Sequence, residues 1–413
     1  MALRVLWFTN TPSLYAKLNG GYNGGGWIAS LEEILGKEKD ISLGIAFFHK
    51  SNKFKVSISE RTYYPIPLFS SKFGYVYRQL FGQSCDQREI NYFLKIIEDF
   101  KPDIIHIFGS EKSYGLLGKR IKVPIILHIQ GLLGPYLNSY FPPGISFAKI
   151  LMRSKPKLMV KHFMAYRNLK FCAKREQEIF QCVTAAIGRT QWDCNIFKIM
   201  SENGKYLHCD EVLRPIFYTS SKWKRYHQGQ RPFKILTTIS PTIYKGLDVV
   251  LKTAKILKTL NNLDFQWSII GIKSSEFWST HTNIQPKDAG VNFLGVLDAE
   301  GLTKEMLDSD LFVHTSYIDN SPNSICEAQL LGLPVVSTNV GGIPTLIQDG
   351  ISGILVPAND IFLLASTILD LSRNSELRDQ LSLGAIGKSS ERHNPEHILK
   401  TLRSIYYSFN KTK

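Results

Sequence analysis

The sequence predicts an α/β protein made of two doubly wound domains, each with a parallel sheet covered by helices on both faces. Short, almost continuous apolar runs alternate with longer segments of helical periodicity along the chain. That alternation is typical of strands buried on both faces and joined by crossover helices. The chain has 413 residues, 44% of them hydrophobic, and a single core rarely grows beyond about 300 residues. Disorder, a collagen repeat and a small disulfide scaffold are therefore excluded.

The first half of the chain contains five strand candidates. They occupy residues 2–9, 41–48, 103–108, 124–129 and 184–187. After the second of them, apolar residues from Ile90 to Ile97 recur at three- and four-residue steps, which predicts a helix. Asp86 is placed to cap the start of that helix, and Lys101-Pro102 to end it.

A second series of strands begins after a stretch rich in proline and charge at residues 214–232. Its members occupy residues 234–240, 265–270, 290–294, 311–315, 334–337 and 353–356. We therefore expect an N-terminal Rossmann-like domain at residues 1–215 and a C-terminal one at 216–392. Residues 393–413 complete the chain with a helix that has one apolar face, so this helix should pack against a domain. Ligands of such folds bind beyond the carboxyl ends of the strands.

The net charge of +15 is concentrated in the first half of the chain. Residues 1–215 hold 30 basic and 17 acidic residues, and residues 112–175 hold 13 basic residues and no acidic one. A solvated basic face is one explanation. Nucleic-acid binding is not expected, because no zinc finger, RNP motif or Gly-x-x-Gly clamp accompanies the run. Apolar residues precede or interrupt the cations, so an anionic membrane surface contacted by residues 141–175 is the sharper alternative.

The cysteines and the N-terminal residues bear on the cell compartment. Six cysteines lie scattered without zinc-ligand spacing, which is typical of a reducing cytosol. The first residues resemble a strand rather than a signal peptide, since Arg4 interrupts a short apolar run. No run approaches the roughly 20 apolar residues that a membrane span needs. We expect a cytoplasmic protein, with any membrane contact peripheral and on the cytoplasmic face.

A glycine-rich loop, residues 20–26, follows the first strand and opens a predicted helix. Five of its seven residues are glycine, which allows the backbone to approach another group closely. The loop matches neither the dinucleotide fingerprint nor the P-loop. It is either a flexible connection or a contact to phosphate or sugar.

The strongest motif runs from His314 to Ala328, with the sequence His-Thr-Ser-Tyr-Ile-Asp-Asn-Ser-Pro-Asn-Ser-Ile-Cys-Glu-Ala. A strand ends there and a helix begins, with Ser or Asn as its expected cap. Free N–H groups and the helix dipole at that point favour an anion such as a diphosphate. Glu327, about one turn into the helix, can accept hydrogen bonds from two vicinal ribose hydroxyls. Asp319 lies in the loop before the helix.

Lys245 also follows a strand and precedes a helix, in the sequence Lys-Gly-Leu-Asp. A lysine at this place can balance the charge of a departing diphosphate. A solvated lysine in the first turn of a helix is the alternative.

Together these motifs resemble the retaining nucleotide-sugar glycosyltransferases of family 4, the glycosyl transferases group 1. The shared order is a glycine-rich loop, Lys-Gly-Leu-Asp, an acidic residue before the Glu of Ser-Pro-Asn-Ser-x-x-Glu-Ala, and Gly-x-Pro-Val-x-x-Thr-x-x-Gly-Gly-x-Pro. The resemblance spans nearly the whole chain and is most specific at residues 293–357. It implies the GT-B fold, with an N-terminal acceptor domain, a C-terminal donor domain and a last helix that crosses back. It also implies a nucleotide-sugar donor, a sugar or lipid-linked sugar acceptor, and no cofactor.

The resemblance assigns roles to individual residues. Glu327 would bind the ribose, Asp319 the hydroxyls of the donor sugar, and Lys245 the diphosphate. His128 would lie near the anomeric carbon; a structural histidine is the alternative, and His106 is a weaker candidate. The remaining substrate-binding residues would line the donor site: Gly25, Gly26, Gly271, Gly295, Ser321, Pro322, Asn323 and Ser324.

Two departures from the family pattern bear on the donor. Asp319 stands where the family often has Glu, which shortens the reach to the sugar by one methylene. Ile239-Ser240-Pro241 replaces the arginine that usually precedes the lysine, so Lys245 has less help on the diphosphate.

Asp308-Ser309-Asp310 spells a metal-binding motif of glycosyltransferases that have another fold. We interpret it as structural, because Asp310 leads directly into a buried strand. No metal is therefore expected.

The sequence thus predicts a retaining, metal-independent hexosyltransferase that moves a sugar from a nucleotide diphosphate to a hydroxyl group. The basic, partly apolar stretch suggests bacterial surface polysaccharide or glycolipid synthesis. A nucleotide-sugar 2-epimerase of the same fold and a catalytically silent scaffold are the alternatives. A hydrolase that uses Asp319 and Glu327 as a carboxylate pair is least favoured, since it would leave the phosphate-binding features without purpose.

Overall fold

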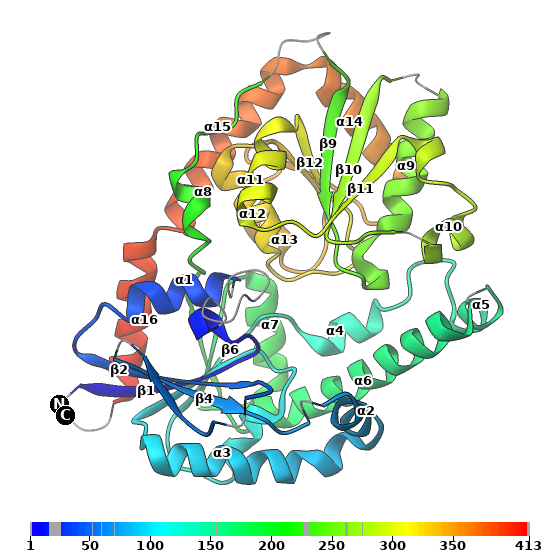
Figure 1. Ribbon diagram of the computed structural model, residues 1–413. Coiled ribbons are helices and arrows are strands. Elements are labelled where there is room, and N and C mark those ends of the chain that lie inside the picture. The colour runs from blue at the N-terminus through cyan, green and yellow to red at the C-terminus, as the bar shows by residue number, and fades with distance from the viewer. Residues whose placement is uncertain are drawn as a thin grey trace. The chain divides into compact units, whose positions relative to one another are not determined.

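The computed structural model describes residues 2–15, 26–51, 53–58, 60–69, 71–153, 155–225, 231–260, 263–274 and 276–410. The chain divides into two compact units, each with its own sheet and helices (Figure 1). Unit 1 comprises Met1–Leu137, Met164–Val212 and His393–Lys413, and unit 2 comprises Asn138–Phe163 and Leu213–Arg392. The α/β fold class expected from the sequence is confirmed.

Residues 138–163 fall in the expected first domain, but the structure groups them with unit 2. Two contacts explain the difference. Lys155 Nζ lies 2.6 Å from Glu276 Oε1, and the ring of His162 packs 4.6 Å from that of Phe277. Helix α6 (Pro156–Phe180) therefore begins in unit 2 and continues into unit 1.

Unit 1 contains an eight-stranded sheet in the order β3-β4-β2-β1-β5-β6-β7-β8. Its strands are β1 (Leu3–Thr9), β2 (Ile41–Phe48), β3 (Val56–Ile58), β4 (Arg61–Ile66), β5 (Ile104–Phe108), β6 (Ile125–His128), β7 (Ala185–Gly188) and β8 (Lys205–His208). All neighbours are parallel except β3 and β4. The central strands are almost wholly buried, which explains why they form unbroken apolar runs in the sequence.

Helices cover both faces of this sheet. They are α1 (Gly26–Leu35), α2 (Lys72–Phe81), α3 (Asp86–Phe100), α4 (Leu133–Asn138), which ends at the boundary with unit 2, α6, α7 (Gln191–Met200) and α16 (Pro395–Phe409). On β1, Leu6 and Phe8 join a core that includes Phe93 of α3. Trp7 points to the opposite face, where its Nε1 donates to the hydroxyl of Tyr406 on α16 at 3.0 Å. The terminal helix thus packs as the sequence predicts.

The start of α3 differs from the prediction. The residue before the helix is Cys85, which has helical backbone angles and ends the 3-10 helix η3 (Gly82–Cys85), so Asp86 is the first helical residue and not the cap. The Asp86 carboxylate instead lies 3.0 Å from Arg175 Nη1 and 3.4 Å from Arg78 Nη2. A buried ion pair with α6 and α2 therefore takes the place of the expected capping bond.

Unit 2 contains a six-stranded parallel sheet in the order β11-β10-β9-β12-β13-β14. Its strands are β9 (Phe233–Thr238), β10 (Phe265–Ile270), β11 (Val291–Gly295), β12 (Leu311–His314), β13 (Val335–Thr338) and β14 (Ile354–Val356). Every one of them overlaps a predicted strand.

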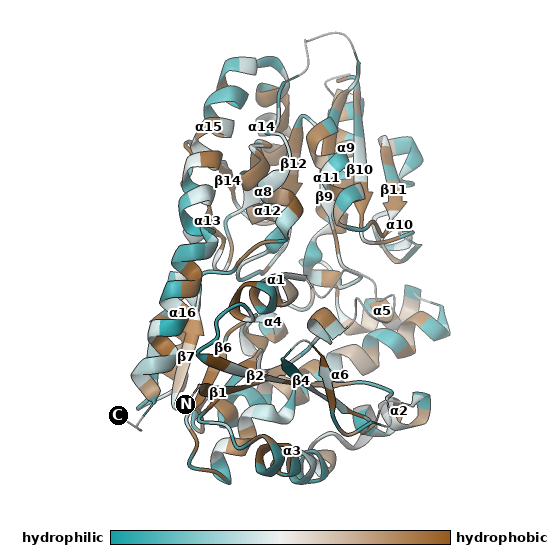
Figure 2. Cartoon of the chain, turned by 60° about the vertical axis from the view of Figure 1, so that its left-hand side comes forward, coloured by the Kyte–Doolittle hydropathy of each residue, from teal (hydrophilic) through white to brown (hydrophobic). Residues whose placement is uncertain are grey.

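Unit 2 also has several helices. They are α5 (Phe147–Arg153), α8 (Pro215–Thr219), α9 (Leu247–Leu260), α10 (Glu276–Thr282), α11 (Ala299–Asp308), α12 (Asn323–Leu331), α13 (Ile343–Leu346), α14 (Ile361–Arg373) and α15 (Ser375–Arg392). Helix α9 packs with α10 and α14, whereas α8, α11, α12 and α15 pack with one another. Figure 2 shows mostly apolar strands, and helices such as α15 and α16 in which polar and apolar residues alternate. No helix among the described residues is long and apolar enough to cross a membrane.

Each sheet has a point at which the chain reverses its direction of travel across the strands. This point lies between β1 and β5 in unit 1, and between β9 and β12 in unit 2. Doubly wound sheets bind their ligands beyond the carboxyl ends of the strands at such a point. The loops that follow β9 and β12 contain Lys245 and Asp319 respectively, so unit 2 has predicted site residues at the place that the topology favours.

Candidate functional site

Two loops of unit 2 meet beyond the carboxyl ends of β9 and β12. The loop after β9 contains the 3-10 helix η5 (Ile243–Lys245) and leads into α9, and the loop after β12 leads into α12. Lys245 Nζ on the first loop lies 2.5 Å from Asp319 Oδ2 on the second. Two residues predicted from separate motifs thus form one ion pair.

Asp319 is buried, and its carboxylate has several partners. Oδ2 also lies 3.1 Å from His314 Nε2 and 3.4 Å from Ser316 Oγ. Burial by itself raises the pKa of Asp319, but the charge of Lys245 and the hydrogen bond from His314 outweigh it and hold this pKa well below its usual range. Burial lowers the pKa of His314, so a neutral imidazole that donates from Nε2 fits the pair. The carboxylate is therefore ionised at neutral pH.

Backbone contacts hold the two loops together. Thr315 Oγ1 donates to the carbonyl of Gly246 at 2.9 Å, and the N–H of Tyr317 donates to the carbonyl of Tyr244 at 2.8 Å. Tyr244 and Gly246 flank Lys245 in the first loop, and Thr315 and Tyr317 precede Asp319 in the second. The relative position of the two charged side chains thus follows from the backbone of both loops.

A pair of glycines after β13 supports the loop that carries Asp319. Gly341 has a φ of +54°, and a Cβ on it would lie 1.9 Å from the carbonyl oxygen of Asp319. The N–H of Gly342 donates to that carbonyl at 3.0 Å. Ser321 in the same loop is buried. A side chain at Gly341 would therefore collide with the backbone of Asp319, which explains the glycine at this position of the Gly-Gly motif.

Helix α12 begins at the site, and no side chain caps it. The residue before the helix is Pro322, in place of the expected Ser or Asn cap. The N–H groups of Ile325 and Cys326 bond to the Pro322 carbonyl. Helix geometry leaves the N–H groups of Asn323 and Ser324 without a partner inside the helix. With the helix dipole, these donors favour an anion at this point.

Glu327 projects from α12 beside an arginine that the sequence reasoning missed. Arg214 Nη2 and Nε lie 2.8 Å and 2.9 Å from Glu327 Oε1, and Glu327 is 4% exposed. The arginine expected just before Lys245 is absent from the sequence, yet the structure brings a guanidinium to the ribose-binding candidate. Arg214 directly precedes α8 and lies far from Glu327 in the chain, so no local pattern could reveal the pair.

Gly271 and Gly295 lie next to each other at the carboxyl ends of β10 and β11, where the N–H of Gly271 donates to the carbonyl of Gly295 at 2.6 Å. Gly271 has a φ of +106°, and a Cβ on it would lie 2.3 Å from the carbonyl oxygen of Ile239. A cavity of about 320 Å³ opens beside Gly271. Its lining includes residues from the loops after β9 and β10, from α10 and from the start of α6: Ser240, Thr242, Lys273, Phe277 and His162.

In unit 1, His128 ends β6 and is almost fully buried. Its imidazole stacks 5.5 Å from that of His106 and packs 5.1 Å from the ring of Trp27. Burial, together with the charges of His106 and Arg189, holds the pKa of His128 well below its usual range, so the ring is neutral. Among the described residues neither ring nitrogen has a hydrogen-bond partner. Buried polar groups are normally paired, so these two nitrogens leave room for a hydrogen-bond partner outside the described residues.

The other candidates in unit 1 are His106, Gly26 and Gly25. His106 Nδ1 lies 2.6 Å from the hydroxyl of Tyr406, and burial lowers its pKa to about 3, which fits a structural role. Gly26 is the first residue of α1 and has a φ of +61°, with open space where a Cβ would stand. Gly25 lies outside the described residues.

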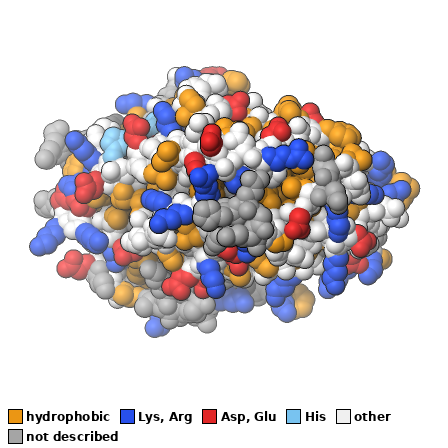
Figure 3. Space-filling model, turned by 90° about the horizontal axis from the view of Figure 1, so that it is seen from above, with side chains coloured by type: hydrophobic (Ala, Val, Ile, Leu, Met, Phe, Trp, Pro, Cys, Tyr) orange, Lys and Arg blue, Asp and Glu red, His pale blue; other side chains and the backbone are white. Residues whose placement is uncertain are grey.

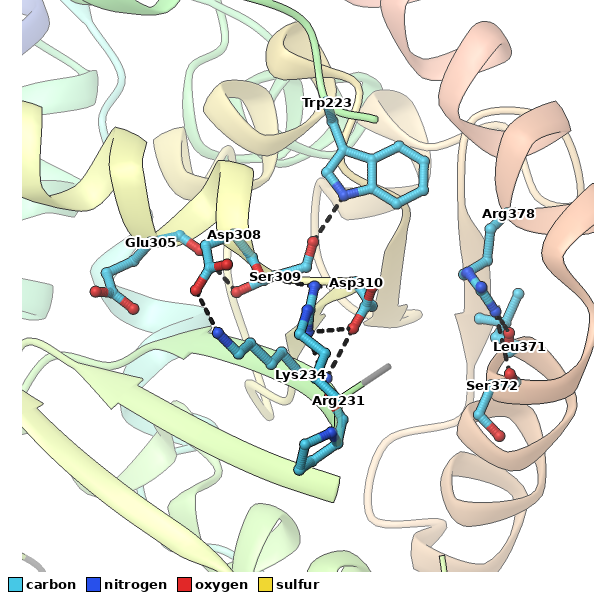
Figure 4. Close-up of polar contacts among 11 residues, drawn as sticks. Trp223, Arg231, Lys234, Glu305, Asp308, Ser309, Asp310, Leu371, Ser372 and Arg378 are labelled. Atoms are coloured by element: carbon cyan, nitrogen blue, oxygen red, sulfur yellow. Dashed lines mark hydrogen bonds and ion pairs between the residues drawn. The ribbon is translucent and has the colours of Figure 1, made fainter. Parts of the chain in front are cut away.

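The two carboxylates of the Asp308-Ser309-Asp310 motif are paired with cations (Figure 4). Asp310 Oδ2 lies 2.9 Å from Arg231 Nη1 and accepts the N–H of Lys234 at 2.9 Å. Asp308 accepts from Lys234 Nζ. These bonds tie the start of β9 to the segment that leads into β12, which is the structural role that the sequence interpretation gives them.

Comparison with known proteins supports the resemblance. Residues 234–374 match the family model described as glycosyl transferases group 1. Over 183 residues the chain is 31% identical to the amylovoran biosynthesis glycosyltransferase AmsK of Erwinia amylovora, a match that covers 42% of this chain and 44% of that protein. The chain thus spans less than half the length of this relative. The resemblance to the glycosyl transferases group 1 is confirmed for the segment that contains Lys245, Asp319 and Glu327.

Solved structures share the fold across the whole chain. Sucrose-phosphate synthase from Thermosynechococcus elongatus superposes with a TM-score of 0.73 at 13% identity, covering 100% of both chains. Anabaena HepE in complex with UDP and glucose superposes with a TM-score of 0.64 at 14% identity, covering 98% of this chain and 100% of that one. The expected GT-B fold is therefore confirmed.

Proposed function

We propose that this protein is a glycosyltransferase that moves a sugar from a nucleotide diphosphate donor to a hydroxyl group of an acceptor. The observation that carries the proposal is the cluster in unit 2, where two buried carboxylates and two cations surround the uncapped start of α12. Apart from Arg214, the whole cluster lies within the segment that matches the family model. Such a cluster combines positive charge for a diphosphate with acceptors for sugar hydroxyls.

The donor would bind along this cluster. Glu327, oriented by Arg214, accepts hydrogen bonds from the ribose hydroxyls, and the free N–H groups of α12 meet the diphosphate. Lys245 adds a cation at the diphosphate, and its partner Asp319 accepts from hydroxyls of the donor sugar. The cavity beside Gly271 receives the nucleobase. UDP and glucose in the HepE structure are a ligand pair of this class.

In the proposed reaction the bond between the anomeric carbon and the diphosphate oxygen breaks, and a bond to the acceptor oxygen forms on the same face of the sugar. The transition state resembles an oxocarbenium ion. Lys245 and the start of α12 stabilise the negative charge on the leaving diphosphate, without need of a metal. The departing phosphate oxygen takes the proton of the acceptor hydroxyl. His128, whose two ring nitrogens have no hydrogen-bond partner among the described residues, is proposed to contact the donor sugar near the anomeric carbon.

The acceptor is proposed to belong to bacterial surface polysaccharide or glycolipid synthesis. AmsK, the relative named above, is a glycosyltransferase of amylovoran biosynthesis by its name. The biosynthetic pathway of the acceptor and the chemistry of the donor are separate proposals, so each can be tested without the other.

We also infer that residues 141–175 bind the cytoplasmic face of an anionic membrane. Met152 on α5 is 76% exposed and Val160 on α6 is 53% exposed, and both lie among exposed cations such as Lys149 and Lys157. Ile150, which the sequence places in the same apolar run, is fully buried and supports the fold instead. Exposed apolar side chains beside lysines are suited to the interface of anionic lipid.

Liposome flotation tests the membrane inference. The protein should float with vesicles that contain phosphatidylglycerol and stay at the bottom with phosphatidylcholine alone, since the attraction depends on anionic lipid. Replacing Met152 and Val160 by Ser should weaken flotation, whereas the same change at exposed Leu383 on α15 should not. Equal recovery on both kinds of vesicle would contradict the inference.

The enzymatic proposal is tested in two steps. A thermal-shift screen with UDP, GDP and their sugars identifies the donor, because a ligand that binds only the folded state stabilises it. The donor is then incubated with and without simple sugar acceptors, and the products are analysed by NMR. Transfer with retained anomeric configuration supports the proposal. Conversion of the donor sugar without an acceptor would instead indicate a 2-epimerase, and no nucleotide binding at all would favour a silent scaffold.

A further inference from the structure

A second cavity, of about 780 Å³, lies wholly within unit 1. Its lining includes Phe48 at the end of β2, Phe69 after β4, and Glu111 after β5. The cavity therefore opens beyond the carboxyl ends of these strands, where α/β sheets bind ligands. Its other walls come from α2 and α6. All its lining residues belong to unit 1, so it is distinct from the donor cluster of unit 2.

The cavity has more cationic than anionic side chains in its lining. Lys50, Lys72 and Lys112 line it, and no hydrogen bond or ion pair joins the side chain of any of these three lysines to another described residue. Lys112 Nζ instead lies 5.5 Å from the ring centre of Phe48, a cation–π contact. Glu111 is the acidic residue of the lining, and it already accepts from Asn10 Nδ2 at 2.8 Å.

A buried ion-pair network beside the cavity explains why Lys112 has no carboxylate partner among the described residues. Arg78, the fourth cation of the lining, is bound by Glu89, and Arg175 lies 3.0 Å from Asp86. Glu89 and Asp86 are thus paired with the two arginines, and Glu111 accepts from Asn10. Burial, followed by the charge of Arg78, lowers the pKa of Lys112. An anion in the cavity would supply the partner that the protein itself does not provide.

We propose that this cavity binds a phosphate or diphosphate group of the acceptor, with Lys112 at its inner wall and Lys50 and Lys72 at its rim. Three ammonium groups can donate to several nonbridging oxygens at once, and their combined charge matches a group of more than one negative charge better than a single carboxylate. The identification of the ligand as the acceptor rests on the proposed function. Anion binding itself does not rest on that function, because it is inferred from the residues that line the cavity.

Two kinds of acceptor carry such a group, a lipid phosphate and a soluble sugar phosphate. Next to Lys72 on α2, Phe73 is 89% exposed, and Val76 and Tyr77 on the same helix are about half exposed. These side chains offer an apolar surface beside the cavity, which would suit the hydrocarbon part of a lipid phosphate. The anion-binding chemistry is the same in both cases.

The direct test measures binding of inorganic pyrophosphate by calorimetry, with the donor site first saturated by the nucleotide that binds there. We expect Lys112→Met to weaken pyrophosphate binding about tenfold or more, the loss expected for one charge-assisted contact. Lys72→Met, at an exposed position that cannot disturb the core, should weaken it less. Lys95→Met, at an exposed lysine of α3 outside the cavity, is the matched control and should bind like the wild type. Equal binding by wild type, Lys112→Met and Lys72→Met would overturn the proposal.

The same titration without nucleotide separates this proposal from the proposed function. If no nucleotide binds at all, the donor function fails, yet a loss of pyrophosphate binding in Lys112→Met and not in Lys245→Met still supports the cavity. Phosphatidylcholine vesicles with and without a polyprenyl phosphate, and glucose 1-phosphate in solution, then compete with pyrophosphate. Competition by either ligand supports the proposal and identifies the source of the phosphate. Competition by neither would contradict the role of the cavity as an acceptor site.

Discussion

Lys245 and Asp319 show how a buried charge pair at the site combines stability with binding. Each partner removes the cost of burying the other, so loss of one leaves an uncompensated charge. Lys245 also keeps part of its side chain, 20%, exposed to solvent, which leaves room for a second anionic partner. The pair can thus stabilise the fold and bind a diphosphate at the same time.

Asp319→Asn should lower the free energy of unfolding by about 2–4 kcal/mol near neutral pH, because it leaves Lys245 without its counter-charge. The low pKa of Asp319 means that its stabilising effect is complete above the unfolded value and is lost as the pH falls below about 4. The difference between wild type and variant should therefore shrink in acid. Urea unfolding at several pH values measures it, with Asp288→Asn at an exposed position as control. A constant difference across this range would contradict the assignment.

Glu176 on α6 should make stability change with pH in the opposite direction from Asp319. Its carboxylate accepts from the N–H of Leu133 at 2.9 Å and from the hydroxyl of Ser110, but burial outweighs these bonds and raises its pKa to about 7. Between about pH 5 and 7 the unfolded chain releases this proton and the folded chain keeps it, so stability falls as the pH rises. The effect is on the order of 3 kcal/mol at most, from about 1.4 kcal/mol per unit of pKa.

The variant Glu176→Gln removes this titration. Its melting temperature should fall less than that of the wild type between about pH 5 and pH 8, which differential scanning calorimetry can measure. Glu178→Gln, two residues along the same helix and paired with Lys119 at the surface, is the matched control. If both variants and the wild type show the same fall in melting temperature, Glu176 does not titrate in this range.

Among the elements, the loop after β13 sets the position of the loop that carries Asp319. Gly341→Ala should destabilise the protein and weaken nucleotide binding together, since the new Cβ would collide with the backbone of Asp319. Gly387→Ala on α15 is the matched control, because open space surrounds its position. That change should stabilise the helix by about 0.5–1 kcal/mol and leave nucleotide binding unchanged. Thermal unfolding and nucleotide titration of both variants check the pair, and normal binding by Gly341→Ala would contradict the steric account.

The elements that could be predicted from the sequence are those buried on both faces. Strand β5, Ile104–Phe108, is buried at every residue and lies within its predicted range of 103–108. Strands β3, β4 and β8 were not predictable in this way. β3 and β8 are exposed edge strands, and β4 begins with Arg61 and contains Pro65, which weaken the apolar signal. The start of α3 was mispredicted because Asp86 pairs with Arg175, a contact between distant parts of the chain.

The same distinction holds for the candidate site. Glu327, Asp319 and Lys245 occupy short motifs, so their place at one sheet edge follows from the strand order. Arg214 and Lys112 could not be identified, because their importance depends on contacts with residues that are distant in sequence. Local spacing carries no information about such pairs.

At the scale of the whole molecule, the positive net charge is not spread evenly. On the face seen in Figure 3, acidic, basic and apolar side chains are interspersed. The basic run of residues 112–175 is divided between the two units, and in unit 1 its first member, Lys112, joins lysines from other elements at one cavity. The net charge thus indicates an anionic ligand only where the fold brings cationic side chains together, as it does at this cavity.

Every proposed role of the unit 2 cluster depends on its binding of a nucleotide diphosphate. Calorimetric titration of UDP and GDP into wild type, Glu327→Gln and the exposed control Glu300→Gln tests it most directly. We predict binding to the wild type and to Glu300→Gln, and binding at least about tenfold weaker in Glu327→Gln, which loses the charge-assisted bonds to the ribose. Thermal unfolding of each variant shows that it is folded at the temperature of titration. Binding of equal strength by all three proteins, or by none of them, would contradict the claim.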